Sequence, residues 1–426
     1  MGIDHNKRLK EHLYYYSARI SRDISNLIKW LVLAVVTGCI VGAASTLFSF
    51  TLKAVTGYRK AHEWIFLLLP LSGLVIVFLY EKLGKEDGGT NQVLSTVRSR
   101  DDVPILSAPL IFITTALTHL TGGSAGREGA AIQLGGSIAN QLGRWIHLDE
   151  EDRHVIVMCG MSAAFSALFG TPVTSAIFSM EVISVGVMYY SAIVPCVIAA
   201  VVGDRISSLF GIAPTEFLLT GVPEGSALGV AKVALLGVLC AVLSILFCVC
   251  MHQSAALYKK LIPNKYLCAA VGGLLVALLT LLVGTRDYNG AGMDVIARAV
   301  AGQARPEAFA LKILFTALTL GAGFKGGEIV PAFFTGATFG NVIGKLLGLS
   351  PSFGAGLGLV ALFCGVTNCP VSSLILSVEL FGAKGFGFFA VVVAVSFMLS
   401  GYYGLYSEQK IVYSKLKPEF IDKKVE

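Results

Sequence analysis

The stretch GGSAGREGAAIQLG, residues 122–135, places one Arg–Glu pair among five glycines in a chain that is otherwise almost continuously apolar. An ionisable pair at membrane depth is costly and is a functional-site hypothesis by default. Glycine allows the sharp turn and the close backbone approach that a loop around a bound ion needs. The residues after Gly129 predict a short helix, whose first turn points free N–H groups back at Arg127 and Glu128. Since a helix N-terminus attracts anions, the stretch predicts an anion site.

The composition around this stretch is that of a polytopic membrane protein. Of the 426 residues, 55% are hydrophobic and 14% are charged, against about 25% charged in soluble domains. Windows such as Trp30–Leu52 and Val233–Met251 are long enough to span a bilayer. The nine cysteines are scattered through apolar segments, which is typical of buried thiols. We therefore expect no metal and no cofactor.

The charged tails predict the orientation. Residues 1–29 carry six basic and three acidic side chains, a net +3, and the tail from Ser407 carries five lysines. The positive-inside rule places both termini in the cytoplasm of a multi-pass protein of the cell membrane. No cleavable signal peptide is expected. The net charge of +6 thus indicates orientation in a membrane and not binding of nucleic acid.

Two pairs of matching segments divide the membrane body into halves. Residues 122–143 and 321–344 are both glycine-rich loops with one basic residue and one Glu, and each leads into a short helix. Residues 169–184 and 367–382 align without gaps as Pro-Val-Thr/Ser-Ser-x-Ile-x-Ser-x-Glu. The two pairs occur in the same order at nearly the same spacing. Interrupted segments at corresponding positions of two halves indicate inverted repeats whose loops converge near the membrane midplane.

The sequence therefore predicts an all-α polytopic membrane protein with inverted-topology repeats and many tilted, discontinuous helices. Its expected parts are an N-terminal cytoplasmic or interfacial helix, a first membrane repeat, a Pro- and Gly-bearing linker, a second membrane repeat and a C-terminal cytoplasmic helix. These parts cover residues 1–28, 29–213, 214–229, 230–405 and 406–426. No regulatory domain is expected after them.

Four glutamates lie within apolar sequence. Glu128 and Glu328 belong to the glycine loops, where a desolvated carboxylate can load and release a proton and can compete with an anion for the same donors. We therefore assign both a role in gating and proton coupling. Glu181 and Glu379 end the Pro-initiated helices, where a polar helix terminus is the favoured interpretation.

Basic and aromatic residues accompany the two glycine loops. Arg127 and Lys325 are expected to tune the local potential or balance charge rather than to contact the ion. The rings of Phe333 and Phe334 have positive edges that could face an anion. Packing of these rings in the core or against lipid is the equal alternative.

These motifs resemble those of the CLC family of chloride channels and proton-coupled anion exchangers. GREGAAIQLG at Gly126–Gly135 is similar to the family's GREGP-type loop, and GGEIVP at Gly326–Pro331 is similar to its GxFxP loop. SGYYGLYSEQ at Ser400–Gln409 resembles the last segment of the family, whose tyrosine hydroxyl reaches the central anion; that tyrosine would be Tyr406. The break at residues 84–93 takes the place of the family's GSGIP loop. The resemblance covers about residues 29–410.

The resemblance implies a homodimer in the lipid bilayer, with one independent ion pathway in each subunit. It also implies a set of positions that form or adjoin the anion site. These positions are Gly89, Thr90, Asn91, Gly126, Arg127, Gly129, Ile329, Val330 and Tyr406.

Departures from the chloride-type pattern favour a fluoride/proton antiporter that exports cytoplasmic fluoride. Glu328 stands where chloride-type members have an apolar residue, and GGEIVP is closer to the GGEVTP pattern of the fluoride/proton branch. Val182 stands where chloride/proton exchangers carry an inner proton-relay Glu. However, Val330 replaces the Thr of the fluoride branch, and the first loop lacks its common Met. A chloride channel or a chloride/proton exchanger is therefore the alternative.

An intramembrane hydrolase is the alternative from another class. Such an enzyme needs a nucleophile–His pair or a set of metal ligands. The seven histidines are dispersed, and neither HExxH nor GxSxG occurs in the chain. We therefore expect no catalytic residues and no enzymatic activity.

Overall fold

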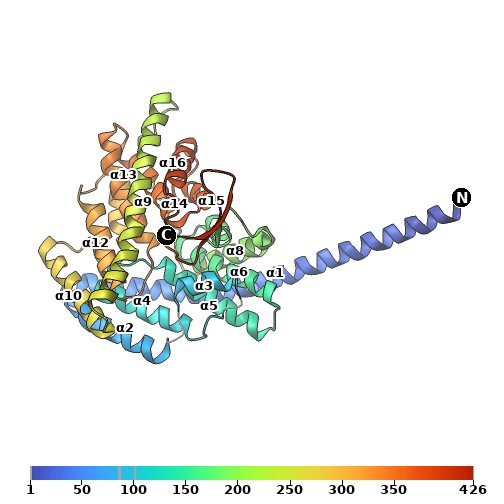
Figure 1. Ribbon diagram of the computed structural model, residues 1–426, viewed down its shortest axis with the longest axis horizontal. Helices are drawn as coiled ribbons and strands as arrows, with labels where there is room; N and C mark the ends of the chain where they lie inside the picture. Colours follow the sequence, from blue (N-terminus) through green and yellow to red (C-terminus); the bar gives the residue numbers. More distant parts are fainter. Residues whose placement is uncertain (1, 85–87, 100–101, 426) are drawn as a thin grey trace.

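The computed structural model describes residues 2–84, 88–99 and 102–425. Within these residues the chain forms sixteen α-helices, two 3-10 helices and three short strands (Figure 1). The predicted helical, polytopic fold is therefore confirmed, with a small sheet added.

Eight α-helices precede the linker and eight follow it. Those of the first half are α1 (Gly2–Ala61), α2 (Leu69–Leu83), α3 (Thr90–Thr96), α4 (Ser107–Thr121), α5 (Glu128–Trp145), α6 (Glu150–Phe169), α7 (Pro172–Glu181) and α8 (Ile193–Leu209). Those of the second half are α9 (Ala227–Leu261), α10 (Lys265–Val283), α11 (Met293–Val300), α12 (Ala308–Gly321), α13 (Ile329–Leu346), α14 (Pro351–Thr367), α15 (Pro370–Phe381) and α16 (Phe386–Leu399). The 3-10 helices η1 (Ile65–Leu68) and η2 (Tyr190–Ala192) lead into α2 and α8.

Six helical stretches among the described residues are long and apolar enough to cross a membrane. They are Tyr14–Ala61, Ile65–Leu83, Tyr190–Leu209, Ala227–Leu261, Lys265–Val283 and Ile329–Leu346. Large apolar side chains are exposed on several of them, for example Leu47, Leu71 and Val242. An outer surface of this kind fits a lipid environment, whereas shorter broken helices such as α7 and α15 fill the interior.

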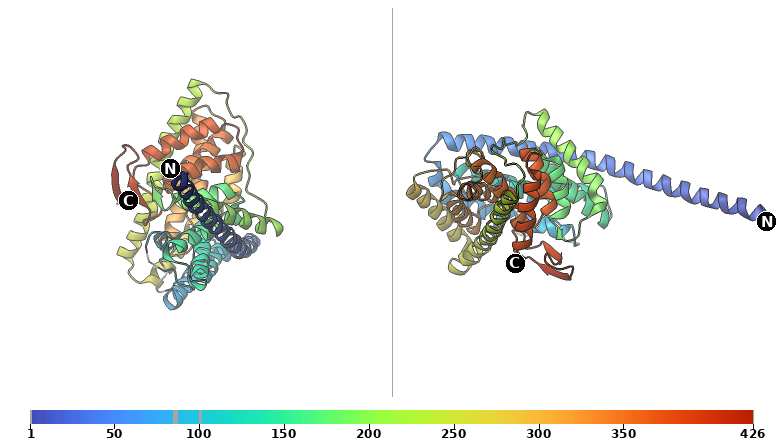
Figure 2. Two further views of the ribbon diagram at one scale, coloured as in Figure 1. Left: turned by 90° about the vertical axis from the view of Figure 1, so that its right-hand side faces the viewer. Right: turned by 90° about the horizontal axis from the view of Figure 1, so that it is seen from above.

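The long first helix differs from the expected division at residue 28. Helix α1 continues through Lys29 without a break, and its N-terminal part projects away from the body of the molecule (Figures 1 and 2). Tyr16, Ile20 and Ile24, which recur at helical spacing, are exposed along this part. The chain has no Gly or Pro between Ser21 and Val36 that would end the helix. Residue 1 lies outside the described residues.

Close helix packing is the same in both repeats. In the first, a Cβ added at Gly135 on α5 would lie 2.3 Å from the carbonyl oxygen of Gly160 on α6. In the second, a Cβ added at Gly340 on α13 would lie 2.2 Å from the carbonyl oxygen of Gly354 on α14. Small residues allow helix backbones to touch, which is how helices associate in lipid. The two glycine loops are thus carried on equivalent, tightly packed helix pairs.

The linker between the repeats is extended chain held to both of them. Its backbone donates from Thr215 to the Phe169 carbonyl and from Phe217 to the Leu380 carbonyl, each over 2.8 Å. Helix α9 begins at Ala227, so the last residues of the predicted linker, 214–229, belong to that helix.

The C-terminal segment corrects one prediction. Residues 406–426 do not form a helix: β2 (Lys410–Tyr413) pairs antiparallel with β3 (Phe420–Lys424) and parallel with β1 (Ser184–Val185). The run of β-branched and aromatic residues in β2 favours a strand, and Pro418 cannot lie inside a helix. The sheet ties the chain end to the residues that follow α7. Residue 426 lies outside the described residues.

Candidate functional site

The two glycine loops meet through their backbones, one from each repeat. The Gly126 amide donates to the Gly327 carbonyl over 2.6 Å, and the Gly327 amide donates to the Gly126 carbonyl over 2.8 Å. The pairing is antiparallel and lies where the two repeats meet, as in transporters built from inverted repeats. The predicted convergence of the two loops is therefore confirmed.

Gly126 and Gly327 must both be glycine, because there is no room for a Cβ atom at either position. A Cβ at Gly126 would lie 2.6 Å from Oε2 of Glu128 and 3.0 Å from the Gly327 carbonyl oxygen. A Cβ at Gly327 would lie 2.6 Å from the Gly129 amide nitrogen. At these two positions only backbone amides and carbonyls can face a bound ion, so any side-chain contact to the ion must come from neighbouring residues.

Glu128 is the first residue of α5 and is fully buried. Its Oε2 accepts from the Arg127 amide over 2.9 Å, and its Oε1 lies 3.5 Å from Nε of Arg127. The backbone amide of Val330, in the first turn of α13, also acts on this carboxylate. The carboxylate thus occupies donors from both repeats, where a free anion would find the same groups.

Arg127 bridges the glycine loop and the end of α6. Its Nη2 lies 3.4 Å from the Leu168 carbonyl, and its guanidinium carbon lies 5.8 Å from the centre of the Phe169 ring. It also lines a hollow of about 780 Å³, which Lys53 and Arg59 line as well. The expected influence on local potential fits this position, since the charge lies between Glu128 and a basic hollow.

Glu328 caps α13 as Glu128 begins α5, yet it has different neighbours. It is half-buried, and in the part of the chain that the structure describes its carboxylate accepts no hydrogen bond. The groups that interact with it electrostatically include the Tyr406 hydroxyl and the Cys248 thiol of α9. Tyr406 also interacts with Glu128, so this buried phenol lies within range of both carboxylates. Ile329 and Val330, which follow Glu328, are fully buried.

The backbone of Tyr406 is anchored by Gln409, a buried residue that sequence reasoning did not single out. The Gln409 amide donates to the Tyr406 carbonyl over 2.9 Å. The Gln409 side chain donates to the carbonyls of Val182 and Thr367 over 3.0 and 2.8 Å. Val182, which stands where chloride/proton exchangers carry a relay glutamate, therefore contributes its backbone carbonyl to this anchor.

Residues 89–91 connect the first glycine loop to the C-terminal segment. Gly89, with φ of +72°, precedes α3, which begins at Thr90. The Thr90 hydroxyl donates to the Gly129 carbonyl over 3.1 Å. The side-chain oxygen of Asn91 accepts from the Glu408 amide over 3.3 Å. The structure thus brings these residues next to the site, while residues 85–87 and 100–101 of the same break lie outside the described part.

A buried lysine that sequence reasoning missed donates a hydrogen bond to the first glycine loop, residues 122–135. Lys312 of α12 is fully buried and donates to the Ser124 hydroxyl over 2.9 Å. It also donates to the carbonyls of Gly290 and Tyr288 over 2.6 and 3.2 Å. The sequence could have indicated this residue, since it is the single Lys inside the apolar run 308–321. A charged side chain rarely lies in a membrane segment without a role.

The two other intramembrane glutamates cap each other's helices. Glu181, at the end of α7, accepts from the amides of Val371 and Ser372 at the start of α15 over 2.9 and 2.8 Å. Glu379, near the end of α15, accepts from the amides of Val173 and Thr174 at the start of α7, each over 2.9 Å. The favoured interpretation as polar helix termini is confirmed. Each glutamate caps the start of the corresponding helix in the other repeat.

The remaining candidates pack as side chains. The Phe333 ring packs edge-on against the rings of Phe169 and Phe363, and Phe334 packs near Tyr288. Core packing is therefore the interpretation that the structure supports for both. Lys325 lies over the ring of Tyr80, 4.2 Å from its centre.

The inverted repeats, the broken helices and the paired glycine loops define a polytopic membrane protein of the transporter and channel class. A profile of the family described as voltage gated chloride channel matches residues 72–401. The chain belongs to this family, the CLC family.

Similar proteins agree with this assignment. The chain is 36% identical over 395 residues to a chloride/fluoride channel protein of Pseudomonas syringae pv. tomato, covering 91% of this chain and 87% of the relative. It superposes with a TM-score of 0.86 on the crystal structure of a CLC-type fluoride/proton antiporter, at 30% identity, covering 90% of this chain and 98% of the other. A slow cyanobacterial Cl⁻/H⁺ antiporter shares the fold, with a TM-score of 0.75 at 18% identity over 87% of this chain and 94% of the other.

Proposed function

We propose that the protein is a fluoride/proton antiporter that exports cytoplasmic fluoride. The observation that carries the proposal is the pair of carboxylates, Glu128 and Glu328, which start equivalent helices of the two repeats and both interact with Tyr406. A chloride channel needs neither a second carboxylate nor proton movement. The printed names of the relative from Pseudomonas syringae and of the fluoride/proton antiporter structure support the same ion.

Glu128 is proposed to act as the gate and proton carrier. In its charged form the carboxylate accepts a hydrogen bond from the Arg127 amide and interacts with the Val330 amide. Protonation removes that charge, so the carboxyl group releases these donors and a fluoride ion takes them. Loss of the proton returns the carboxylate to the same donors, which excludes the anion. Proton and anion movements are coupled because the charged carboxylate and the anion compete for one set of backbone donors, so the anion gains these donors only when Glu128 takes up a proton.

Glu328 is proposed to make the coupling selective for fluoride. Fluoride is small and strongly hydrated, so its pathway must replace tight water contacts with strong donors. A protonated Glu328 and the Tyr406 hydroxyl are the side-chain donors at hand, and the Thr90 hydroxyl joins them if it turns from the Gly129 carbonyl. Fluoride also shares a proton with a neutral carboxylic acid, so Glu328 serves as donor and as proton relay.

We further propose a homodimer in the cell membrane with both termini in the cytoplasm. The exposed apolar helices support the membrane placement, and the basic tails support the orientation. Labelling a cysteine introduced at Ser407 from outside intact cells tests the orientation, and we expect no labelling. The mass of the protein in lipid nanodiscs tests the dimer.

Flux from liposomes tests the transport proposal. With purified protein in liposomes, a fluoride gradient should drive uphill proton movement, and a fluoride electrode should report faster efflux than a chloride electrode. Glu128→Gln should abolish proton movement, whereas Glu151→Gln, at the start of α6, should retain it. Chloride flux equal to or faster than fluoride flux supports the chloride alternative. Fluoride flux without proton movement would make the protein a channel.

A further inference from the structure

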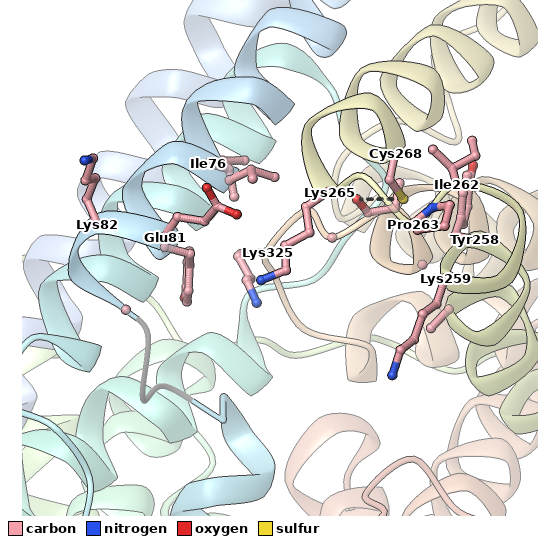
Figure 3. A pocket seen from close by; sticks show the side chains of 17 residues that line it. Ile76, Glu81, Lys82, Tyr258, Lys259, Ile262, Pro263, Lys265, Cys268 and Lys325 are labelled. Atoms are coloured by element: carbon pink, nitrogen blue, oxygen red, sulfur yellow. Dashed lines mark hydrogen bonds between the residues drawn. The ribbon is translucent and has the colours of Figure 1, made fainter.

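A pocket of about 1030 Å³ lies between α2, α9, α10 and the start of the second glycine loop, which follows α12 (Figure 3). Four lysines line it, one from each of these segments: Lys82, Lys259, Lys265 and Lys325. Its only acidic lining residue among the described ones is Glu81. In Figure 3, Lys265 and Lys325 point into the same space, which Glu81 faces from α2. Among the described residues, the lining therefore carries more positive than negative charge.

Three of these lysines hold charge that no described partner balances. Lys82, Lys259 and Lys265 are exposed, and none of them has an ion-pair partner in residues 2–84, 88–99 or 102–425. Glu81 lies beside the Tyr266 hydroxyl of α10. Of these three, Lys82 points away from the space that Lys265 and Lys325 share in Figure 3. The ammonium groups of Lys259 and Lys265 remain to attract an anion that accepts several hydrogen bonds, such as a phosphate.

The walls of the pocket are apolar and belong to membrane-crossing helices. They include Ile76 and Val77 of α2, Tyr258 and Ile262 of α9, and Cys268 of α10. These helices lie in three of the stretches long enough to span a bilayer. Lys82 lies at the last turn of α2, Lys259 at the last turn of α9 and Lys265 at the first residue of α10. The lysines thus gather at one membrane interface, with the apolar wall extending toward the bilayer interior.

We infer that this pocket binds an anionic phospholipid, with the phosphate among Lys259, Lys265 and Lys325 and acyl chains along the walls of α2 and α9. Both parts of the ligand are needed, because an inorganic anion alone would leave the apolar wall uncovered. Basic pockets between membrane helices are suited to lipid head groups. The lysine-rich end of these helices is also the one that the positive-inside rule places in the cytoplasm, where anionic lipids concentrate.

The site bears on transport through Lys325, and this consequence rests on the proposed function. Lys325 precedes the Gly126–Gly327 bridge and Glu328 on the same loop. A phosphate held by Lys325 would fix the start of that loop. Anionic lipid should therefore raise the rate of fluoride transport rather than merely raise stability.

Binding is tested first, independently of transport. Native mass spectrometry of the full chain, titrated with phosphatidylglycerol or phosphatidylcholine, should show tighter binding of phosphatidylglycerol. Each neutralised lysine that faces the phosphate should weaken that binding about fivefold. Lys259→Gln measures one such step, and the double variant Lys259→Gln, Lys265→Gln measures two. Lys82→Gln should weaken binding little, because that side chain points away from the space shared by Lys265 and Lys325. Lys260→Gln is the matched control, because this exposed neighbour on α9 does not line the pocket.

Three binding results would overturn the inference. These are equal binding of both lipids by the unchanged protein, equal weakening by Lys259→Gln and Lys260→Gln, and complete displacement of the lipid by glycerol phosphate. The last result would assign the pocket to a soluble phosphate.

Transport supplies the second arm. In phosphatidylcholine liposomes with and without phosphatidylglycerol, the unchanged protein should transport fluoride faster with the anionic lipid, and Lys259→Gln should lose that difference. An unchanged protein that binds the lipid but moves fluoride in neither membrane would refute the proposed function and leave the lipid site standing. A difference that Lys259→Gln retains would refute the link between the pocket and the loop.

Discussion

At the scale of single residues, the site depends on glycines that have no room for a side chain. The sequence could predict that Gly126 and Gly327 lie in loops around an ion, because both stand beside a Glu in an apolar chain. It could not predict that they bond to each other, since they are 201 residues apart and no local pattern records the contact (327 − 126 = 201). Likewise, the sequence could not predict that the side-chain oxygen of Asn91 accepts from the Glu408 amide. The assignment of Asn91 to the anion site stays a prediction.

Gly126→Ala should inactivate the protein. The new methyl group would meet Glu128 Oε2 at 2.6 Å and the Gly327 carbonyl at 3.0 Å, so the bridge or the carboxylate must move. We expect fluoride efflux from liposomes to fall at least tenfold and the free energy of unfolding to fall by about 1–3 kcal/mol. Gly57→Ala is the control, because nothing lies within 4 Å of a Cβ on that residue of α1. Normal flux in Gly126→Ala would contradict the close fit.

Val330→Thr should favour fluoride. Val330 is fully buried in the first turn of α13, and Thr adds a hydroxyl donor in nearly the same volume. A hydrogen bond to a charged partner contributes about 1.5–3 kcal/mol, so the ratio of fluoride to chloride flux should rise about tenfold. Val233→Thr, which buries a hydroxyl on α9, controls for the cost of the hydroxyl itself. An unchanged ratio would mean that this side chain does not reach the ion.

At the scale of elements, the two Pro-initiated helices are joined by exchanged caps. The shared motif in residues 169–184 and 367–382 allowed both helices and their polar ends to be predicted. The exchange was not predictable, because a Glu at the end of a helix reads as a local terminus until the neighbouring helix is placed. The strands β2 and β3 were missed for a similar reason: a five-lysine tail has the composition of a solvated helix, and strand partners lie elsewhere in the chain.

Glu181→Ala and Glu379→Ala should destabilise the protein without uncoupling it. Each removes the acceptor from two helix-start amides, which costs about 0.5–2 kcal/mol. Thermal unfolding in detergent should show a lower midpoint for both, while the number of protons moved per fluoride stays constant. Glu151→Ala, at the start of α6, should change neither quantity. Loss of proton coupling at unchanged stability would instead assign Glu181 to the proton path.

At the scale of the whole molecule, the order of apolar and broken segments was enough to predict two inverted repeats, and their loops do meet. The composition could not predict where the charged side chains gather in the folded molecule. The hollow at Arg127 is also lined by Lys53 and Arg59 of α1 and by Arg286, which follows α10. These charges gather only when the two repeats pack together, because Lys53, Arg59 and Arg127 belong to the first repeat and Arg286 belongs to the second.

Lys53→Gln should slow transport in a salt-dependent way. Lys53 is exposed and lines the hollow that Arg127 shares, so it should attract anions to that side of Glu128. Screening extends over about 30 Å at 0.01 M salt and about 8 Å at 0.15 M. Fluoride flux should therefore fall about twofold at the lower salt concentration, and the difference should shrink at the higher one. Lys384→Gln, outside the hollow, is the control, and a salt-independent loss would argue for a structural role of Lys53.

The bridge between Gly126 and Gly327 also constrains how such a chain can change over generations. Each loop supplies both a donor and an acceptor to the other, so neither copy of the repeat can drift alone. A backbone shift in one loop misplaces the hydrogen bonds of its counterpart and the carboxylate that follows it. Substitutions near position 126 should therefore be tolerated only with particular residues near position 327. The two loops are therefore expected to change together, although they lie in different halves of the chain.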